Sequence, residues 1–208
     1  MTVEILVKFL ENTAKIMNEN REYLIALDSV VGDGDLGLTM GDGYQAAYES
    51  IKDIDEKDAG KLLYNAGKAM SIKVPSTMGT LMASGFMQAG KALKGKTELS
   101  DSDMVTLFAS YEEGVQKRGK AEIGEKTFLD GIHPAVEALK KAIEGGESLS
   151  TASSKAAEAA EDGFKHTTQM IAKHGRAATR GEASRSLEDP GAAVAKLLLD
   201  AFFTTMND

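Results

Sequence analysis

Three acidic side chains crowd into eight positions of the stretch LDSVVGDGDLGLTM, residues 27–40. Asp28, Asp33 and Asp35 are these residues, and glycines stand between them. Because carboxylates at this spacing repel one another, a cation or bulk water must lie among them. Mg²⁺ prefers hard oxygen ligands and takes a few carboxylates from a protein and the rest from phosphates and water. We therefore expect a metal site with Asp28, Asp33 and Asp35 as its ligands.

A helix is expected to begin near Leu38, directly after the acidic turn. Its free N–H groups and positive dipole end favour a phosphate, and the glycines of the turn let the backbone approach one closely. Thr39 adds a hydroxyl at the same end. Carboxylates, a divalent metal and a helix N-terminus together are typical of sites that handle nucleotide phosphates.

Two alternatives use the same residues without a nucleotide. A fully solvated acidic turn needs no ligand, and a DGD motif by itself does not exclude it. A calcium loop of the EF-hand type needs regularly alternating ligands and a Glu at about the twelfth position. The stretch DGDLGLTMGDGY has neither, so the calcium interpretation is the weaker one.

Composition limits the classes of protein and partner. The chain has 208 residues, is 42% hydrophobic, contains no Cys and carries a formal net charge of −8, which predicts one domain over residues 1–208. The missing Cys excludes disulfides and thiolate chemistry, and the negative charge argues against nucleic acid as a partner. The N-terminus lacks a basic segment followed by a long apolar run, and no window approaches about 18 uncharged apolar residues. We therefore expect no membrane partner and a cytoplasmic location.

Hydrophobic spacing indicates helix along almost the whole chain, and no stretch alternates as a strand does. Val3, Leu6, Leu10 and Met17, for example, share one helical face, and Ser100 is a typical N-cap before two acidic residues. Short Gly-containing turns and only three Pro predict an all-α bundle of antiparallel helices. Eight helices are expected, around residues 3–17, 40–52, 58–72, 79–93, 101–115, 126–144, 150–173 and 191–205.

Three segments rich in Gly and polar residues resemble the signatures of one protein family. They are DSVVGDGDLG at 28–37, RGKAEIGEKTFLD at 118–130 and HGRAATRGEASRSLEDPGA at 174–192. In composition, order and spacing they resemble the nucleotide-binding subunit of dihydroxyacetone kinases over essentially the whole chain.

This resemblance implies a closed barrel of eight antiparallel helices, with ADP or ATP held by the interhelical loops at one end. It assigns a pair of Mg²⁺ ions to Asp28, Asp33 and Asp35, which the metals bridge to the nucleotide phosphates. The nucleotide contacts that it implies are Leu36, Gly37, Leu38, Thr39, Thr77, Met78, Gly119, Phe128, Arg176, Asp189, Pro190 and Gly191.

The sequence departs from the family pattern at two places. Leu36 stands where many members have His, and PSTMGT at 75–80 replaces a Gly-Gly-x-Ser-Gly stretch, with Met78 in place of the Ser. The phosphate contact of that Ser then falls to Ser76 or Thr77, and an acceptor sugar other than plain dihydroxyacetone stays open.

Other polar residues have two interpretations each. His133, three residues after Asp130, suggests a base oriented by an acid, although a structural role at a helix start is the stronger interpretation. Asp189 before Pro190 predicts an N-cap followed by Pro at the first helical position, which is compatible with a nucleotide contact.

The family resemblance implies a phosphotransferase subunit that passes the γ-phosphoryl group of ATP to a short ketose or tetrose. The sugar is bound by a separate sugar-binding kinase subunit, so a partner is expected. The phosphoryl donor is either free ATP or a phosphohistidine protein of the phosphotransferase system, which rephosphorylates bound ADP. A regulatory protein that senses nucleotide without turnover is the alternative.

Overall fold

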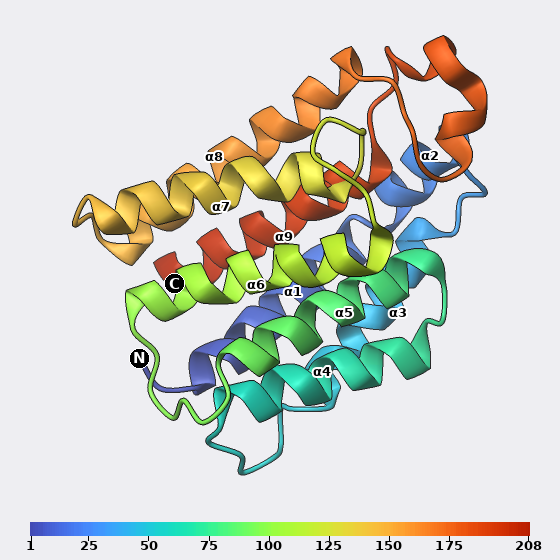
Figure 1. Cartoon of the computed structure of the whole chain (residues 1–208). Helices are drawn as coiled ribbons and strands as arrows, with labels where there is room; N and C mark the ends of the chain where they lie inside the picture. The colour runs from blue at the N-terminus through green and yellow to red at the C-terminus, as the bar shows by residue number, and fades with distance from the viewer.

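Helices make up nearly all the regular structure of the computed structural model, which describes residues 1–208 (Figure 1). The only β pairing is an isolated bridge between Thr2 and Glu98, and the all-α fold class predicted from the sequence is confirmed. Two 3₁₀ segments, η1 (Thr167–Gln169) and η2 (Arg176–Ser184), lie between the last two helices. The α-helices are α1 (Glu4–Glu19), α2 (Arg21–Val31), α3 (Leu36–Glu49), α4 (Ala59–Lys73), α5 (Thr77–Ala92), α6 (Asp101–Gly119), α7 (Phe128–Glu144), α8 (Leu149–His166) and α9 (Pro190–Asn207).

The helices form a closed ring. From α3 to α8, each helix packs against the next one along the chain, and α9 packs against both α8 and α1. The ring closes because α1 also packs against α3. Helix α2 prolongs α1 beyond Asn20 and packs against α3 as well. With α1 and α2 counted as one bent helix, eight helices close the ring, in agreement with the predicted fold.

Three helix boundaries differ from those predicted. The sequence predicts no separate helix over residues 21–31, where α2 lies, because α2 buries only Leu24 and Val31 and its apolar pattern is weak. Helix α3 begins at Leu36 rather than near residue 40, since the Asp28 carboxylate accepts from the Leu36 amide and supports an earlier start. Helix α8 ends at His166 rather than at 173, where the chain turns into η1.

Neighbouring helices run in opposite directions, so α3, α5, α7 and α9 all begin at the same end of the ring, at the right in Figure 1. Four helix N-termini therefore direct their positive dipole ends toward one region. The connections at this end are residues 32–35, 74–76, 120–127 and 167–189. Three of them coincide with the Gly-rich segments that the sequence distinguishes.

One core cluster of 50 buried residues fills the ring. At its centre the hydroxyls of Tyr44 and Tyr111 lie 3.2 Å apart, so neither polar group is buried without a partner. Helices α4 and α5 approach closely at two glycines, because a Cβ on Gly60 would lie 2.4 Å from the Gly90 carbonyl oxygen. None of the helices combines the length and the apolar character needed to cross a bilayer.

Candidate metal and nucleotide site

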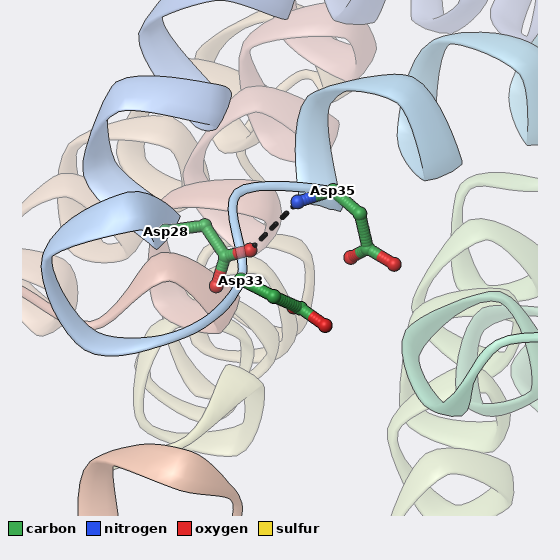
Figure 2. Close-up of side chains that lie close together, drawn as sticks. All are labelled: Asp28, Asp33 and Asp35. Atoms are coloured by element: carbon green, nitrogen blue, oxygen red, sulfur yellow. Dashed lines mark hydrogen bonds between the residues drawn. The ribbon is translucent and has the colours of Figure 1, made fainter.

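The turn between α2 and α3 is organised around the carboxylate of Asp28. Its Oδ2 accepts hydrogen bonds from the amides of Gly34 at 2.9 Å, Asp35 at 3.1 Å and Leu36 at 3.4 Å. Figure 2 shows the bond from the Asp35 amide. Gly34 has φ of 75°, and a Cβ there would lie 2.5 Å from Ser29 Oγ, so this position requires glycine. The turn folds back because one side chain satisfies three consecutive amides.

The three predicted metal ligands converge on this turn. One carboxylate oxygen from each of Asp28, Asp33 and Asp35 lies within 4.8 Å of the other two, and Figure 2 shows the three side chains gathered there. A Cβ at Gly32 would lie 2.3 Å from Asp28 Oδ1, so glycine keeps that oxygen clear of the backbone. A set of carboxylate oxygens, two of the side chains exposed, suits a hard divalent cation that keeps water and phosphate in its shell.

Electrostatics within the cluster favour an added cation. Loss of solvation raises the pKa of Asp35, and the neighbouring charges of Asp33 and Asp28 raise it further, while Arg176 lowers it. A pKa raised by like charges indicates that the fully ionised cluster is unfavourable by itself. A divalent cation held by the three carboxylates would offset this repulsion.

Arg176 reaches the acidic cluster from the connection between α8 and α9. Its Nη2 donates to Asp33 Oδ2 at 2.6 Å, and both side chains are exposed. Arg180, one turn further along η2, donates to the carbonyl oxygen of Val30 at the end of α2. The connection 167–189, which we call the α8–α9 segment, is thus held against the neighbouring acidic turn.

A cavity of about 900 Å³ lies beside the carboxylates and takes residues from all four connections. Its volume is that of a site for a nucleotide-sized ligand. Besides the three aspartates, nine of the twelve predicted nucleotide contacts line it: Leu36, Thr77, Met78, Gly119, Phe128, Arg176, Asp189, Pro190 and Gly191.

Gly37, Leu38 and Thr39 are not among the lining residues, and the phosphate contact expected of Thr39 stays a prediction. Because α3 starts at Leu36, Thr39 lies inside its first turn and is only 7% exposed. Leu38 faces solvent. Gly37 serves packing, since a Cβ there would lie 2.1 Å from the carbonyl oxygen of Arg21.

The stretch that departs from the family pattern forms the start of α5. Ser76 caps this helix, its Oγ accepting from the Gly79 amide at 3.1 Å, and Ser76, Thr77, Met78 and Thr80 all line the cavity. Hydroxyls on either side of Met78 are therefore present where the family pattern has its Ser.

Asp189 caps α9 as predicted, with its Oδ2 accepting from the Ala192 amide at 2.7 Å and Pro190 at the first helical position. The side chain is buried, and burial raises its pKa to about 7. The nearby charge of Asp130 raises this pKa as well, while the Ala192 amide and Lys126 lower it.

His133 does not pair with Asp130. Its Nδ1 lies 2.8 Å from Glu112 Oε1 on α6, outside the cavity lining. Asp130 instead caps the start of α7, accepting from the amides of Thr127 at 2.7 Å and Gly124 at 2.5 Å. The structural interpretation of His133 agrees with these contacts.

Sequence reasoning missed two parts of the cavity wall. One is Lys126, a buried lysine, whose type and position give no sign of burial. The other is apolar: Leu81, Val115, Ala121 and Leu129 read only as ordinary helix and loop residues in the sequence.

The chain is thus an all-α protein in which a closed ring of antiparallel helices carries, at one end, a carboxylate cluster beside a nucleotide-sized cavity, an arrangement that suits a metal ion and a phosphate ligand. The chain belongs to the DAK2 domain family, whose model matches residues 30–204. The resemblance drawn from the three sequence segments is thereby confirmed.

Two bacterial relatives match the chain over nearly its whole length. The ADP-binding subunit DhaL of the PEP-dependent dihydroxyacetone kinase of Escherichia coli is 35% identical over 187 residues, which is 90% of this chain and 89% of that protein. The corresponding subunit of PEP-dependent dihydroxyacetone kinase 2 of Listeria innocua is 32% identical over 203 residues, covering 95% and 92%.

Among solved structures, the fold matches the native dihydroxyacetone kinase of C. freundii with a TM-score of 0.74 and 22% identity. The match covers 96% of this chain and 34% of that one, so the chain spans about a third of the larger kinase. A second structure of the C. freundii enzyme, with a TM-score of 0.72, is a complex with AMP-PNP and Mg²⁺.

Proposed function

We propose that this chain is the phosphotransferase subunit of a two-part kinase. It binds ADP or ATP with Mg²⁺ and transfers the γ-phosphoryl group to dihydroxyacetone, or to a related short ketose or tetrose, held by a separate sugar-binding subunit. The observation that carries the proposal is the convergence of three carboxylates on the rim of a cavity of about 900 Å³. Family membership supports the same reaction class.

The cavity wall divides into parts that suit the parts of a nucleotide. Leu81, Gly119 and Phe128 give a largely apolar surface for a base, while the start of α5 and Arg176 offer N–H donors to phosphates. The three aspartates line the same cavity. We place the base against the apolar surface and the phosphates between the start of α5 and the aspartates.

In this mechanism the residues position groups and balance charge, and none needs to act as a base. Asp28 keeps a fixed orientation because three amides hold one of its oxygens. Asp28, Asp33 and Asp35 would hold Mg²⁺, which would supply positive charge to the phosphate oxygens. Arg176 exchanges Asp33 for a phosphate oxygen, which places a guanidinium on the group being transferred.

The acceptor and the donor come from outside this chain. The curated relatives named L-erythrulose kinase, in Pectobacterium atrosepticum, and L-erythrulose 1-kinase, in Mycolicibacterium smegmatis, are longer, and the chain covers 34% of each. Their names support a tetrose as well as a triose as acceptor. The names PEP-dependent and PTS-dependent, the latter in Lactococcus lactis, support a phosphohistidine protein as the source of the phosphoryl group.

The test is phosphoryl transfer in the presence of a sugar-binding subunit from a related kinase. The chain is mixed with that subunit, ATP and Mg²⁺, and phosphorylated dihydroxyacetone and erythrulose are measured separately. We expect product only when both proteins are present. Tight nucleotide binding without product would favour the regulatory alternative. Retention of ADP through purification favours a phosphohistidine protein as the phosphoryl donor. The cytoplasmic location stays a prediction.

A further inference from the structure

Lys126 is a buried lysine in the connection between α6 and α7. Its side chain and backbone together are only 2% exposed, and its φ of 63° lies in the left-handed region. Lysine is almost never fully buried unless its ammonium has strong partners. Here all the partners are carbonyl oxygens of one other segment, the α8–α9 segment: Thr167 at 2.6 Å, Met170 at 3.4 Å, Arg185 at 3.2 Å and Leu187.

These carbonyls lie at the two ends of the α8–α9 segment. Thr167 and Met170 follow the end of α8, and Arg185 and Leu187 precede the start of α9. One ammonium therefore joins the two ends of a segment whose middle carries Arg176. Thr167 is 41 residues and Leu187 is 61 residues from Lys126 in the sequence, so no local sequence pattern imposes this contact.

The preceding residue makes a second attachment to the same segment. Glu125 accepts from His174 Nε2 at 2.5 Å and from Lys173 Nζ at 3.4 Å, and its backbone carbonyl accepts from the Lys173 amide at 3.2 Å. These contacts are more exposed than those of Lys126. They hold the part of the segment that leads directly into Arg176.

Burying an ammonium is costly unless hydrogen bonds replace its hydration. Four carbonyl oxygens supply those bonds here. Burial lowers the pKa of Lys126, and the nearby charge of Asp189 opposes that shift. If the lysine is removed, four carbonyls lose a donor at once and the segment loses the contact that joins its ends.

We propose that Lys126 is a positioning residue that holds the α8–α9 segment in its ligand-binding arrangement before any nucleotide arrives. The consequence for nucleotide affinity rests on the function proposed above. A segment ordered in advance does not have to be ordered by the ligand, so binding is tighter. Loss of Lys126 then loosens the segment while the helical ring stays folded.

The test compares Lys126→Met with Lys120→Met. Lys120 is a matched control because it lies in the same connection, also has a positive φ of 56°, and is exposed without lining the cavity. Amide hydrogen exchange is measured for residues 168–188 and for the core helices, in protein free of nucleotide. We expect exchange in the segment to rise about tenfold or more in Lys126→Met, with core helices unchanged and Lys120→Met like the wild type.

A rescue experiment separates the ammonium from general damage. The chain contains no Cys, so a Lys126→Cys variant has one thiol, which can be alkylated with 2-bromoethylamine in denaturant and the protein refolded. The product carries an ammonium at nearly the original distance from the backbone. We expect alkylation to restore slow exchange in the segment and to restore affinity for Mg-ADP, which falls about tenfold or more in Lys126→Met.

Unchanged exchange of the segment in a folded Lys126→Met variant overturns the proposal. So does a loss of Mg-ADP affinity without faster exchange, since Lys126 would then act on the nucleotide directly. If Lys126→Met does not fold, Glu125→Gln takes its place, because it weakens the second attachment and must speed exchange around residues 173–176. If segment exchange is faster in Lys126→Met but the wild type binds no nucleotide, the role of Lys126 in holding the segment is supported and the proposed function is refuted.

Discussion

Arg176 and Asp33, 143 residues apart in the sequence, form an ion pair of 2.6 Å at the rim of the cavity. The pair joins the α8–α9 segment to the acidic turn, and it occupies a carboxylate that belongs to the proposed metal site. Both side chains are largely exposed, so the pair contributes little to the stability of the fold. Its importance lies in keeping a cation next to the carboxylates.

Arg176→Met is therefore expected to weaken the binding of Mg-ADP without destabilising the protein. Loss of a charge-assisted hydrogen bond to phosphate corresponds to about 1.5–3 kcal/mol, or roughly 10- to 150-fold in Kd. Calorimetric titration measures the affinity, and thermal unfolding measures the stability. Arg180→Met is the comparison, because Arg180 lies in the same 3₁₀ segment and donates to the Val30 carbonyl without lining the cavity, so its loss weakens the attachment of the segment but removes no phosphate contact. Equal effects of the two substitutions would show that Arg176 has no special role.

Gly34→Ala is expected to disturb the acidic turn. A side chain at this position meets both a φ of 75° and a Cβ contact of 2.5 Å with Ser29 Oγ. Gly95→Ala is the control for backbone strain alone, since Gly95 has a φ of 82° and no atom within 4 Å of an added Cβ. Each substitution should cost about 1–2 kcal/mol in the free energy of unfolding, measured by urea denaturation, with Gly34→Ala the larger. Only Gly34→Ala should also reduce affinity for Mg-ADP, because it moves the amides that hold Asp28.

Asp189 predicts a pH dependence of stability. Burial raises its pKa to about 7 in the folded protein, against an ordinary value of 3.8. Between these two pH values the folded state keeps a proton that the unfolded state has lost, so this group makes stability fall as pH rises from about 4 to 7. Asp189→Asn removes the titration but keeps an oxygen that can accept from the Ala192 amide.

The measurement is the difference in unfolding free energy between Asp189→Asn and the wild type at several pH values. The unfolding free energy of the variant should rise relative to that of the wild type by up to about 1.4 kcal/mol per pH unit between about pH 4 and 7. The difference should level off above pH 7. A constant difference from pH 4 to 8 would mean that Asp189 is ionised throughout. Taking the difference removes the pH-dependent contribution of all the other carboxylates, because both proteins contain them.

The parts of the site that the sequence predicts are those encoded by neighbouring residues. Asp28, Asp33 and Asp35 lie within eight positions, so a single turn brings their oxygens together. The caps at Ser100 and Asp189 follow from the residue types and the helices that come next.

What the sequence does not predict depends on contacts between distant segments. Lys126 reads as a solvent-exposed residue, and its burial appears only when carbonyls from the α8–α9 segment surround it. The sequence indicates a start of α3 near Leu38, whereas the hydrogen bond from the Leu36 amide to the Asp28 carboxylate supports a start at Leu36, so Thr39 lies inside the first turn. Neighbouring residues determine the order of the helices, whereas the cavity wall forms only when segments distant in the sequence pack together.

The central claim is that the acidic turn holds the metal that binds the nucleotide phosphates. It is tested most directly by calorimetric titration of the protein with ADP, with and without Mg²⁺, in the wild type, Asp33→Asn and Asp55→Asn. Asp55 is a matched control, being an exposed aspartate that pairs with Lys57 outside the cavity. We predict that wild-type binding requires Mg²⁺, that Asp55→Asn behaves alike, and that Asp33→Asn loses about 2–5 kcal/mol, roughly 30-fold or more in Kd. ADP binding that is independent of Mg²⁺, or unchanged in Asp33→Asn, would contradict this account.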